Sequence, residues 1–159
     1  MKNTDPTFVP FLRNICKENE EAVAFLVLIT NLAHFWDDVI DADPAPSKAV
    51  MHEGMWACLV DLPRDPFYKR YFPELNPLMA NAILDWRVAN RLEAGEPATS
   101  HRRISFIIRS SYVCILQQTA LIVGGPEWAE VCGLAIRVKC HAEGFDAYLK
   151  SLGGSDGNV

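Results

Sequence analysis

The sequence predicts an all-α protein, a helical bundle of about six helices, and two observations support this prediction. Proline and glycine residues interrupt the chain at intervals that leave segments of helical length between them. No β-hairpin dipeptide lies between alternating apolar and polar runs, and the sequence shows no internal repeat. With 159 residues, half of them hydrophobic, the chain is long enough to bury one core, so we expect a single domain over residues 1–159.

The first half of the chain is expected to form three helices. A short helix at about 8–16 precedes a long one at about 19–42. The segment from Ala22 to Ile29 is apolar nearly all round, which places the long helix at the centre of the bundle. Ser47 is a favourable N-cap for a third helix at about 47–61, which follows Pro44 and Pro46.

Prolines and glycines delimit the second half of the chain. A single turn is expected at about 65–71, between two pairs of prolines. Pro77 and Gly95 bound a helix at about 77–94, and the Gly124-Gly125-Pro126 run separates the last two helices. These last helices are expected at about 100–123, packed beside the long central helix, and at about 126–152.

Charge and cysteine content narrow the expected partners and location. A net charge of -5 and a pI near 5.3 argue against a nucleic-acid partner, because phosphate binding depends on clustered Lys and Arg. The five cysteines form an odd count without a C-x-x-C pair, which favours a reducing cytoplasm. The first ten residues contain no apolar stretch that could serve as a signal peptide.

Two apolar segments of the sequence are candidates for membrane spans. The segment Ala22–Ile29 is too short to cross a bilayer. The segment Ile104–Val123 is long enough, but it contains Arg109 together with serines and glutamines. We therefore expect no membrane span and a buried helix at Ile104–Val123.

An acidic cluster lies near the end of the long helix, in the stretch "NLAHFWDDVIDADP". At 100° per residue, His34, Asp37, Asp38 and Asp41 fall within a sector of about 100° on one helix face. These four side chains can therefore converge on one point. A hard cation with oxygen ligands, such as Mg²⁺, is the metal that such a cluster suits.

The cluster lacks a positive partner within its own helix. No Lys or Arg lies between Lys17 and Lys48, so like charges should repel by a few tenths of a kcal/mol per pair. The negative end of the helix dipole adds to this cost. We expect compensation from outside the helix, either by a metal ion or by an arginine of a neighbouring helix. A solvated helix end, with Asp41 and Asp43 as cap residues, is the structural alternative.

The segment "DDVID" from Asp37 to Asp41 resembles the D-D-x-x-D motif of class I isoprenoid synthases, and "HFWDDVIDADP" is similar to the stretch around that motif in prenyl diphosphate synthases. The resemblance implies that Asp37, Asp38 and Asp41 bind Mg²⁺ that holds a substrate diphosphate, whose loss generates an allylic carbocation. His34, one turn from Asp38, is a further candidate ligand.

A second acidic stripe lies on the predicted helix at 77–94. Asn81, Asp85 and Glu93 recur there at multiples of four residues. The resemblance implies that Asp85 and Glu93 form a second metal-binding motif opposite the first, although Ala89 stands where the family has Ser or Thr. The alternative is the polar face of an ordinary amphipathic helix.

Arg102, Ser105 and Arg109 share one face of the predicted helix at 100–123. We expect Arg102 and Arg109 to stabilise a departing diphosphate. Arg109 interrupts an apolar run, so its guanidinium requires an anionic partner, either a ligand phosphate or one of the carboxylates of Asp37 and Asp85. For Arg102, near the start of the helix, a solvated basic cap is the alternative.

These features favour a Mg²⁺-dependent transferase or lyase that acts on a small-molecule diphosphate substrate. The bundle would be a reduced form of the isoprenoid-synthase fold, and a homo-oligomer that completes the site remains an open alternative. An all-α nucleotide pyrophosphohydrolase is a second hypothesis, based on Glu18-x-x-Glu21 and Asp38-x-x-Asp41. On a continuous helix these pairs would be about 25 Å apart, so this hypothesis requires a turn near Thr30 and Asn31.

A non-enzymatic helical adaptor is the third hypothesis. The aromatic segment "FYKRYF", Phe67 to Phe72, lies between prolines and would form a partner interface together with the tryptophan-bearing helices. The structural alternative is that this segment packs onto the core of its own chain.

Overall fold

Helices make up almost all of the structure, a computed structural model that describes residues 5–41, 45–95, 99–142 and 144–153. No strand occurs in these ranges, and the all-α prediction is confirmed. The elements in chain order are α1 (Phe8–Ile15), α2 (Glu20–Asp41), α3 (Lys48–Trp56), the π-helix η1 (Ala57–Asp61), α4 (Leu62–Arg64), α5 (Pro66–Arg70), α6 (Phe72–Ala94), α7 (Thr99–Ile108), α8 (Val113–Gly124), α9 (Pro126–Cys140) and α10 (Phe145–Gly153).

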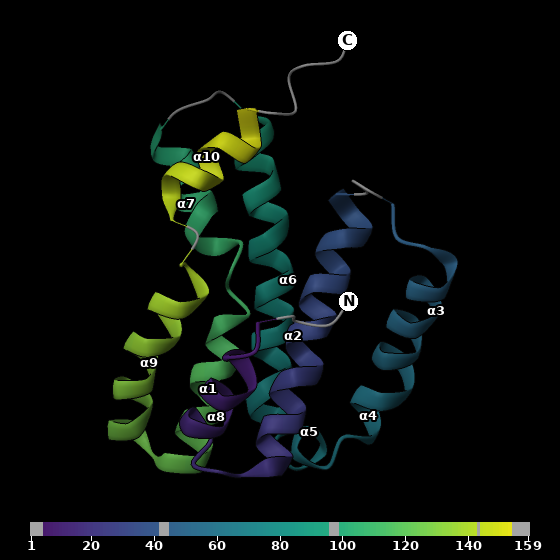
Figure 1. The fold of residues 1–159 in the computed structure, drawn as a ribbon, viewed down its shortest axis with the longest axis vertical. Coiled ribbons are helices and arrows are strands. Elements are labelled where there is room, and N and C mark those ends of the chain that lie inside the picture. The colour runs from purple at the N-terminus through teal and green to yellow at the C-terminus, as the bar shows by residue number, and fades with distance from the viewer. Residues whose placement is uncertain (1–4, 42–44, 96–98, 143, 154–159) are drawn as a thin grey trace.

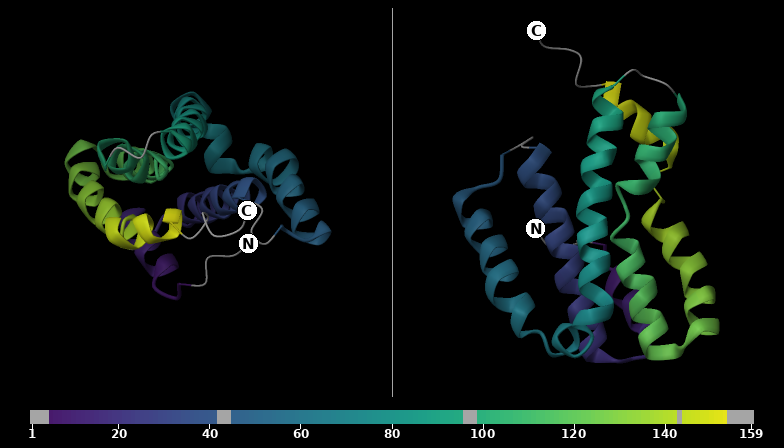
Figure 2. Two further views of the ribbon diagram at one scale, coloured as in Figure 1. Left: turned by 90° about the horizontal axis from the view of Figure 1, so that it is seen from above. Right: turned by 180° about the vertical axis from the view of Figure 1, so that it is seen from behind.

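The long helix α2 is central, as its apolar sequence predicts. It packs against α1, α3, η1, α5 and α8, and Phe25 and Leu26 on it are fully buried. Seen from above, α2 lies among the other helices, with α3 on one side and α9 on the other (Figure 2). The main hydrophobic cluster joins residues of α1, α2, α4, α5, α6, α8 and α9 and includes no described residue of α7 or α10. Helices α7 and α10 lie together at the end of the molecule opposite α5 (Figure 1).

The predicted helix at 100–123 is broken in the structure. It divides into α7 and α8, which are inclined by 45° to each other. Between them the backbone N–H groups of Ser110, Ser111 and Val113 donate to carbonyls three residues earlier. This tighter turn replaces the regular α-helical pattern, and the two serines favour it because they are weak helix formers in a helix interior. The part that packs beside α2 is α8.

The other boundary errors also have local causes. The predicted helix at 126–152 divides into α9 and α10 because Gly144 adopts a left-handed conformation with φ of 78°. Helix α6 begins at Phe72 rather than near Pro77: Pro73 lies in its first turn, where a proline removes no helical hydrogen bond, and the helix continues through Pro77. The predicted helix at 47–61 is α-helical only to Trp56 and continues as the π-helix η1. The expected count of about six helices is therefore too low.

Two features of the structure bear on the alternative hypotheses of a pyrophosphohydrolase and an adaptor. Helix α2 runs without a break from Glu20 to Asp41, so the turn near Thr30 that a pyrophosphohydrolase site would require is absent from this described segment. In the aromatic segment, Phe67 and Tyr68 are buried and stack on Phe25 with ring centroids 5.6 and 5.9 Å apart. The segment thus packs mainly on its own core, which removes the main support for an adaptor.

Among the described residues, one helix could cross a membrane by its length and composition. This is α2 over Glu20–Ile40, a longer apolar stretch than the segment Ala22–Ile29 considered from the sequence. The bent pair Ser100–Ile108 and Val113–Gly124 would be a second if it formed one span. The core helix of a soluble protein meets the same criteria of length and composition.

Helix α3 approaches α2 through a glycine. A Cβ atom built on Gly54 would overlap the ring of Phe35, which is itself buried. We expect Gly54→Ala to lower the free energy of unfolding by about 1–3 kcal/mol, although alanine is the better helix former by about 1 kcal/mol. Urea unfolding followed by circular dichroism measures this change.

The matched control for this prediction is the same substitution in a Phe35→Leu background. The smaller side chain leaves space for the methyl group, so Gly54→Ala should then be neutral or stabilising. Equal destabilisation in both backgrounds would contradict the overlap with the ring.

Candidate functional site

A cavity of about 410 Å³ lies between α2, η1, α6 and the turn that joins α7 to α8. Its walls are mostly apolar, with Ile29, Leu32 and Met79 among the lining residues. Among the described residues that line it, Asp37 and Arg109 are the only Asp, Glu, Lys or Arg. The cavity is therefore an apolar chamber with one ion pair in its wall.

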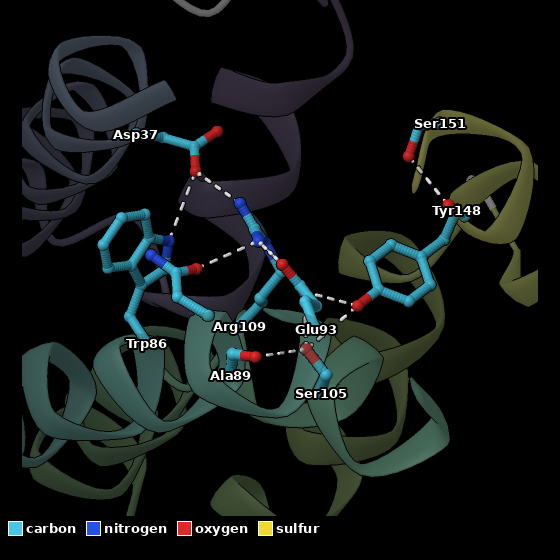
Figure 3. Close-up of polar contacts among 9 residues, drawn as sticks. Asp37, Trp86, Ala89, Glu93, Ser105, Arg109, Tyr148 and Ser151 are labelled. Atoms are coloured by element: carbon cyan, nitrogen blue, oxygen red, sulfur yellow. Dashed lines mark hydrogen bonds and ion pairs between the residues drawn. The ribbon is translucent and has the colours of Figure 1, made fainter. Parts of the chain in front are cut away.

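The ion pair connects the central helix to the turn between α7 and α8. Arg109 Nη2 lies 3.3 Å from Asp37 Oδ1, and the indole N–H of Trp86 donates to the same oxygen at 3.2 Å (Figure 3). The guanidinium carbon of Arg109 also lies 5.6 Å from the centre of the Trp86 ring. An arginine from outside α2, in the turn between α7 and α8, thus compensates Asp37, and compensation by an arginine is one of the two solutions that the sequence left open.

Glu93 supplies the second carboxylate for this arginine. Arg109 Nη1 donates to Glu93 Oε2 at 2.6 Å and to Asn90 Oδ1 at 3.2 Å. The side chain of Glu93 is 13 % exposed, against 46 % for Asp37. The ion pair with Glu93 is thus shorter and less exposed to solvent than the pair with Asp37, and it should be the stronger of the two.

The other oxygen of Glu93 is held by two hydroxyl groups. Ser105 Oγ and Tyr148 Oη each lie 2.5 Å from Glu93 Oε1, and 2.9 Å from each other (Figure 3). Ser105 Oγ also lies 3.2 Å from the carbonyl oxygen of Ala89. Each hydroxyl has one proton, and we place both protons toward the carboxylate because those contacts are the shortest.

Burial changes the acidity of groups around the cavity. Burial, followed by the hydrogen bond to Glu93, raises the pKa of Tyr148 to about 12. Burial likewise raises the pKa of Tyr112 and of the Cys140 thiol, which both line the cavity. These groups remain neutral at physiological pH, so they add no charge to that of Asp37, Glu93 and Arg109.

The structure unites three of the predicted site residues. Asp37, Glu93 and Arg109 form one network, and His34 lines the same cavity. Asp38 and Asp85 make no hydrogen bond or ion pair with any residue in the described ranges. The side chain of Asp41 lies outside the described residues.

The remaining predictions for the site concern Arg102 and the metal. The Nε atom of Arg102 is buried and has no hydrogen-bond partner among the described residues. Within the same residues no group of three or more His, Cys, Asp and Glu side chains is arranged to hold a metal ion. A metal at this site would therefore need ligands beyond the described side chains, such as water or substrate oxygens.

Sequence reasoning missed Tyr148 and Trp86 as members of this network. Tyr148 is 55 residues away from Glu93 in the sequence, and no motif connects them. The spacing of Ser105 and Arg109 by four residues was the usable signal, because it places both on one helix face.

Comparisons with known proteins identify no relative of this chain. No family model matches the chain, and no curated protein or solved structure is significantly similar to it. The function proposed below therefore depends on the cavity and on the charged network in its wall.

The exposure of each carboxylate predicts unequal effects on stability. Arg109→Gln leaves the Glu93 carboxylate without its positively charged partner, and we expect a loss of about 2–3 kcal/mol in the free energy of unfolding. Asp37→Asn should cost less than about 1 kcal/mol, because the side chain of Asp37 is almost half exposed. Urea unfolding measures both variants, with exposed Arg87→Gln as the control. Similar losses for Asp37→Asn and Arg109→Gln would show that the two carboxylates are equivalent partners.

The raised pKa of Tyr148 predicts a loss of stability in alkali. The hydroxyl titrates near pH 10 in the unfolded chain and near pH 12 in the folded one. Its contribution is complete below pH 10 and is lost as the pH rises toward 12, because the unfolded state releases the proton first. Tyr148→Phe should therefore show a smaller decrease in unfolding free energy between these pH values, with the remainder due to Tyr112 and other groups. Identical pH profiles for the two proteins would contradict the assignment.

Proposed function

We propose that the protein is a Mg²⁺-dependent transferase or lyase that promotes the departure of diphosphate from an apolar substrate, in a reduced bundle of the class I isoprenoid-synthase type. One observation supports this most directly: an apolar cavity of about 410 Å³ has Asp37 and Arg109 in its wall. This volume falls within the range of about 300–1,000 Å³ that is typical of small-molecule sites. The hydrocarbon part of a substrate would lie in the chamber and its diphosphate at the charged end.

The free side of Asp37 suits a hard cation. Oδ1 accepts hydrogen bonds from Trp86 and Arg109, whereas Oδ2 accepts none from the part of the chain that the structure describes (Figure 3). Asp38 follows directly and has no partner in the described ranges. Mg²⁺ commonly takes one or two carboxylates and completes its coordination with water and phosphate oxygens, so Asp37 and Asp38 would suffice to hold it.

The chain itself would perform three tasks in this reaction. Bound Mg²⁺ would supply charge neutralisation for the leaving diphosphate. The Nη2 group of Arg109 would donate to a phosphate oxygen in place of its long contact with Asp37, while Nη1 stays bonded to Glu93. The apolar walls exclude water, and the rings of Trp36 and Trp86, which line the cavity, offer faces that stabilise a carbocation.

Glu93 has a different role in this proposal from the one that the resemblance implies. Its two oxygens are occupied by Arg109, Ser105 and Tyr148, so we assign it to holding the arginine rather than to binding metal. Asp85 is a candidate metal ligand only through the sequence resemblance, since it does not line the cavity. Arg102 lies on the same helix face as Ser105 and is the second candidate for contact with the diphosphate.

Calorimetric titration of Mg²⁺ with and without pyrophosphate tests the proposal. Pyrophosphate should strengthen Mg²⁺ binding in the wild type, and Asp37→Asn/Asp38→Asn should abolish that enhancement by removing the carboxylate ligands. Glu127→Gln/Glu130→Gln is the matched control, because it removes two exposed acidic groups from the start of α9, neither of which lines the cavity. This control should bind as the wild type does.

An activity assay on the wild type and on Asp38→Asn provides a second test. Release of pyrophosphate from an allylic diphosphate should require Mg²⁺ and should be lost in Asp38→Asn, with the fold retained or slightly stabilised because a repulsive charge is gone. Pyrophosphate-independent Mg²⁺ binding in the wild type, or none at all, would overturn the proposed function.

A further inference from the structure

The carboxylate of Glu93 links the last helix of the described chain to the wall of the cavity. Its Oε1 faces Ser105 on α7 and Tyr148 on α10, and its Oε2 faces Arg109. Arg109 in turn reaches Asp37 on α2. A chain of short polar contacts thus runs from α10 to the charged end of the cavity (Figure 3).

The position of the Tyr148 hydroxyl is fixed by the packing of its ring. Tyr148 is 7 % exposed, and its ring centroid lies 5.2 Å from that of Phe106 and 6.1 Å from that of Phe145. Helix α10 packs against α7, which carries both Phe106 and Ser105. The two hydroxyls therefore approach Glu93 from a rigid aromatic environment and not from flexible side chains.

Glu93 and Arg109 would otherwise be mobile. Both have long side chains that lose much rotamer freedom when they are held in one geometry. Two charge-assisted hydrogen bonds at 2.5 Å restrict the Glu93 carboxylate to one orientation, in which Oε2 points at Arg109. The guanidinium is then held between Glu93 and Asp37, with its carbon over the ring of Trp86.

We propose that Ser105 and Tyr148 are positioning residues for diphosphate recognition: they lock Glu93, which holds Arg109 at the charged end of the cavity. This inference rests on the proposed function in that the diphosphate is the ligand of Arg109. Neither hydroxyl touches the substrate. Both act through Glu93, and α10 becomes a functional part of a site to which it contributes no ligand.

Tyr148→Phe is the sharpest variant, because it keeps the ring between Phe106 and Phe145 and removes only the hydroxyl. Ser105→Ala removes the second hydroxyl. Tyr68→Phe is the matched control: it removes a buried tyrosine hydroxyl that donates to Asn76 at 2.9 Å, away from the cavity. Each variant is also made in an Arg109→Gln background, in which a residue that acts only through Arg109 has no further effect.

The first measurement follows the Arg109 guanidinium in the ligand-free protein. Nitrogen-15 NMR of arginine side chains, assigned with Arg109→Lys, should show slow rotation of this group in the wild type and in Tyr68→Phe. Tyr148→Phe and Ser105→Ala should each accelerate that rotation. Unchanged rotation in both variants would overturn the proposal, whether or not pyrophosphate binds.

The second measurement is the dissociation constant of pyrophosphate in saturating Mg²⁺. Tyr148→Phe and Ser105→Ala should each weaken binding by about tenfold in the wild-type background and by less than about twofold in the Arg109→Gln background. Undiminished pyrophosphate binding in both variants would overturn the proposal. Absence of binding in the wild type would overturn the proposed function, and the NMR result alone would then decide whether the two hydroxyls position Arg109.

Discussion

The ion pairs of the Arg109 guanidinium are the interaction on which the charged end of the cavity depends. The guanidinium is held by carboxylates from two long helices, Asp37 on α2 and Glu93 on α6. Like charges on two facing helices repel, and the sequence of α2 contains no Lys or Arg that could relieve the repulsion. One cation between them stabilises both, and it does so beside a chamber that is otherwise apolar. The same arginine therefore both relieves the repulsion between the two carboxylates and gives the cavity its charged end.

The break between α7 and α8 gives this arginine its place. A straight helix over Ile104–Val123 would be mostly apolar with one charge, Arg109, in its interior, which is a costly arrangement unless a partner lies directly opposite. The turn at 109–112 instead sets Arg109 at a corner, where it can reach α2 and α6 together. The apparent defect in the helix and the charged end of the cavity thus have a common origin.

The sequence predicts some of this architecture well and some of it not at all. The bounds and central position of α2, and the need for a cation from outside it, follow from local periodicity and charge. The breaks near Ser110 and Gly144 depend on turn conformations that compete closely with a continuous helix, so periodicity alone favours the wrong outcome. The choice of Glu93 over Asp85 as the partner of Arg109, and the participation of Tyr148, are set by packing between distant segments and leave no local pattern.

The distribution of the hydrophobic core has an evolutionary consequence. The main cluster is built from α1, α2, α4, α5, α6, α8 and α9, whereas α7 and α10, which hold Glu93 in place, contribute no described residue to it. Substitutions in these two helices can retune the charged end of the cavity while the core that maintains the fold is preserved. Such a division makes a protein evolvable: selection can explore new ligands through one part of the chain at little risk to the other.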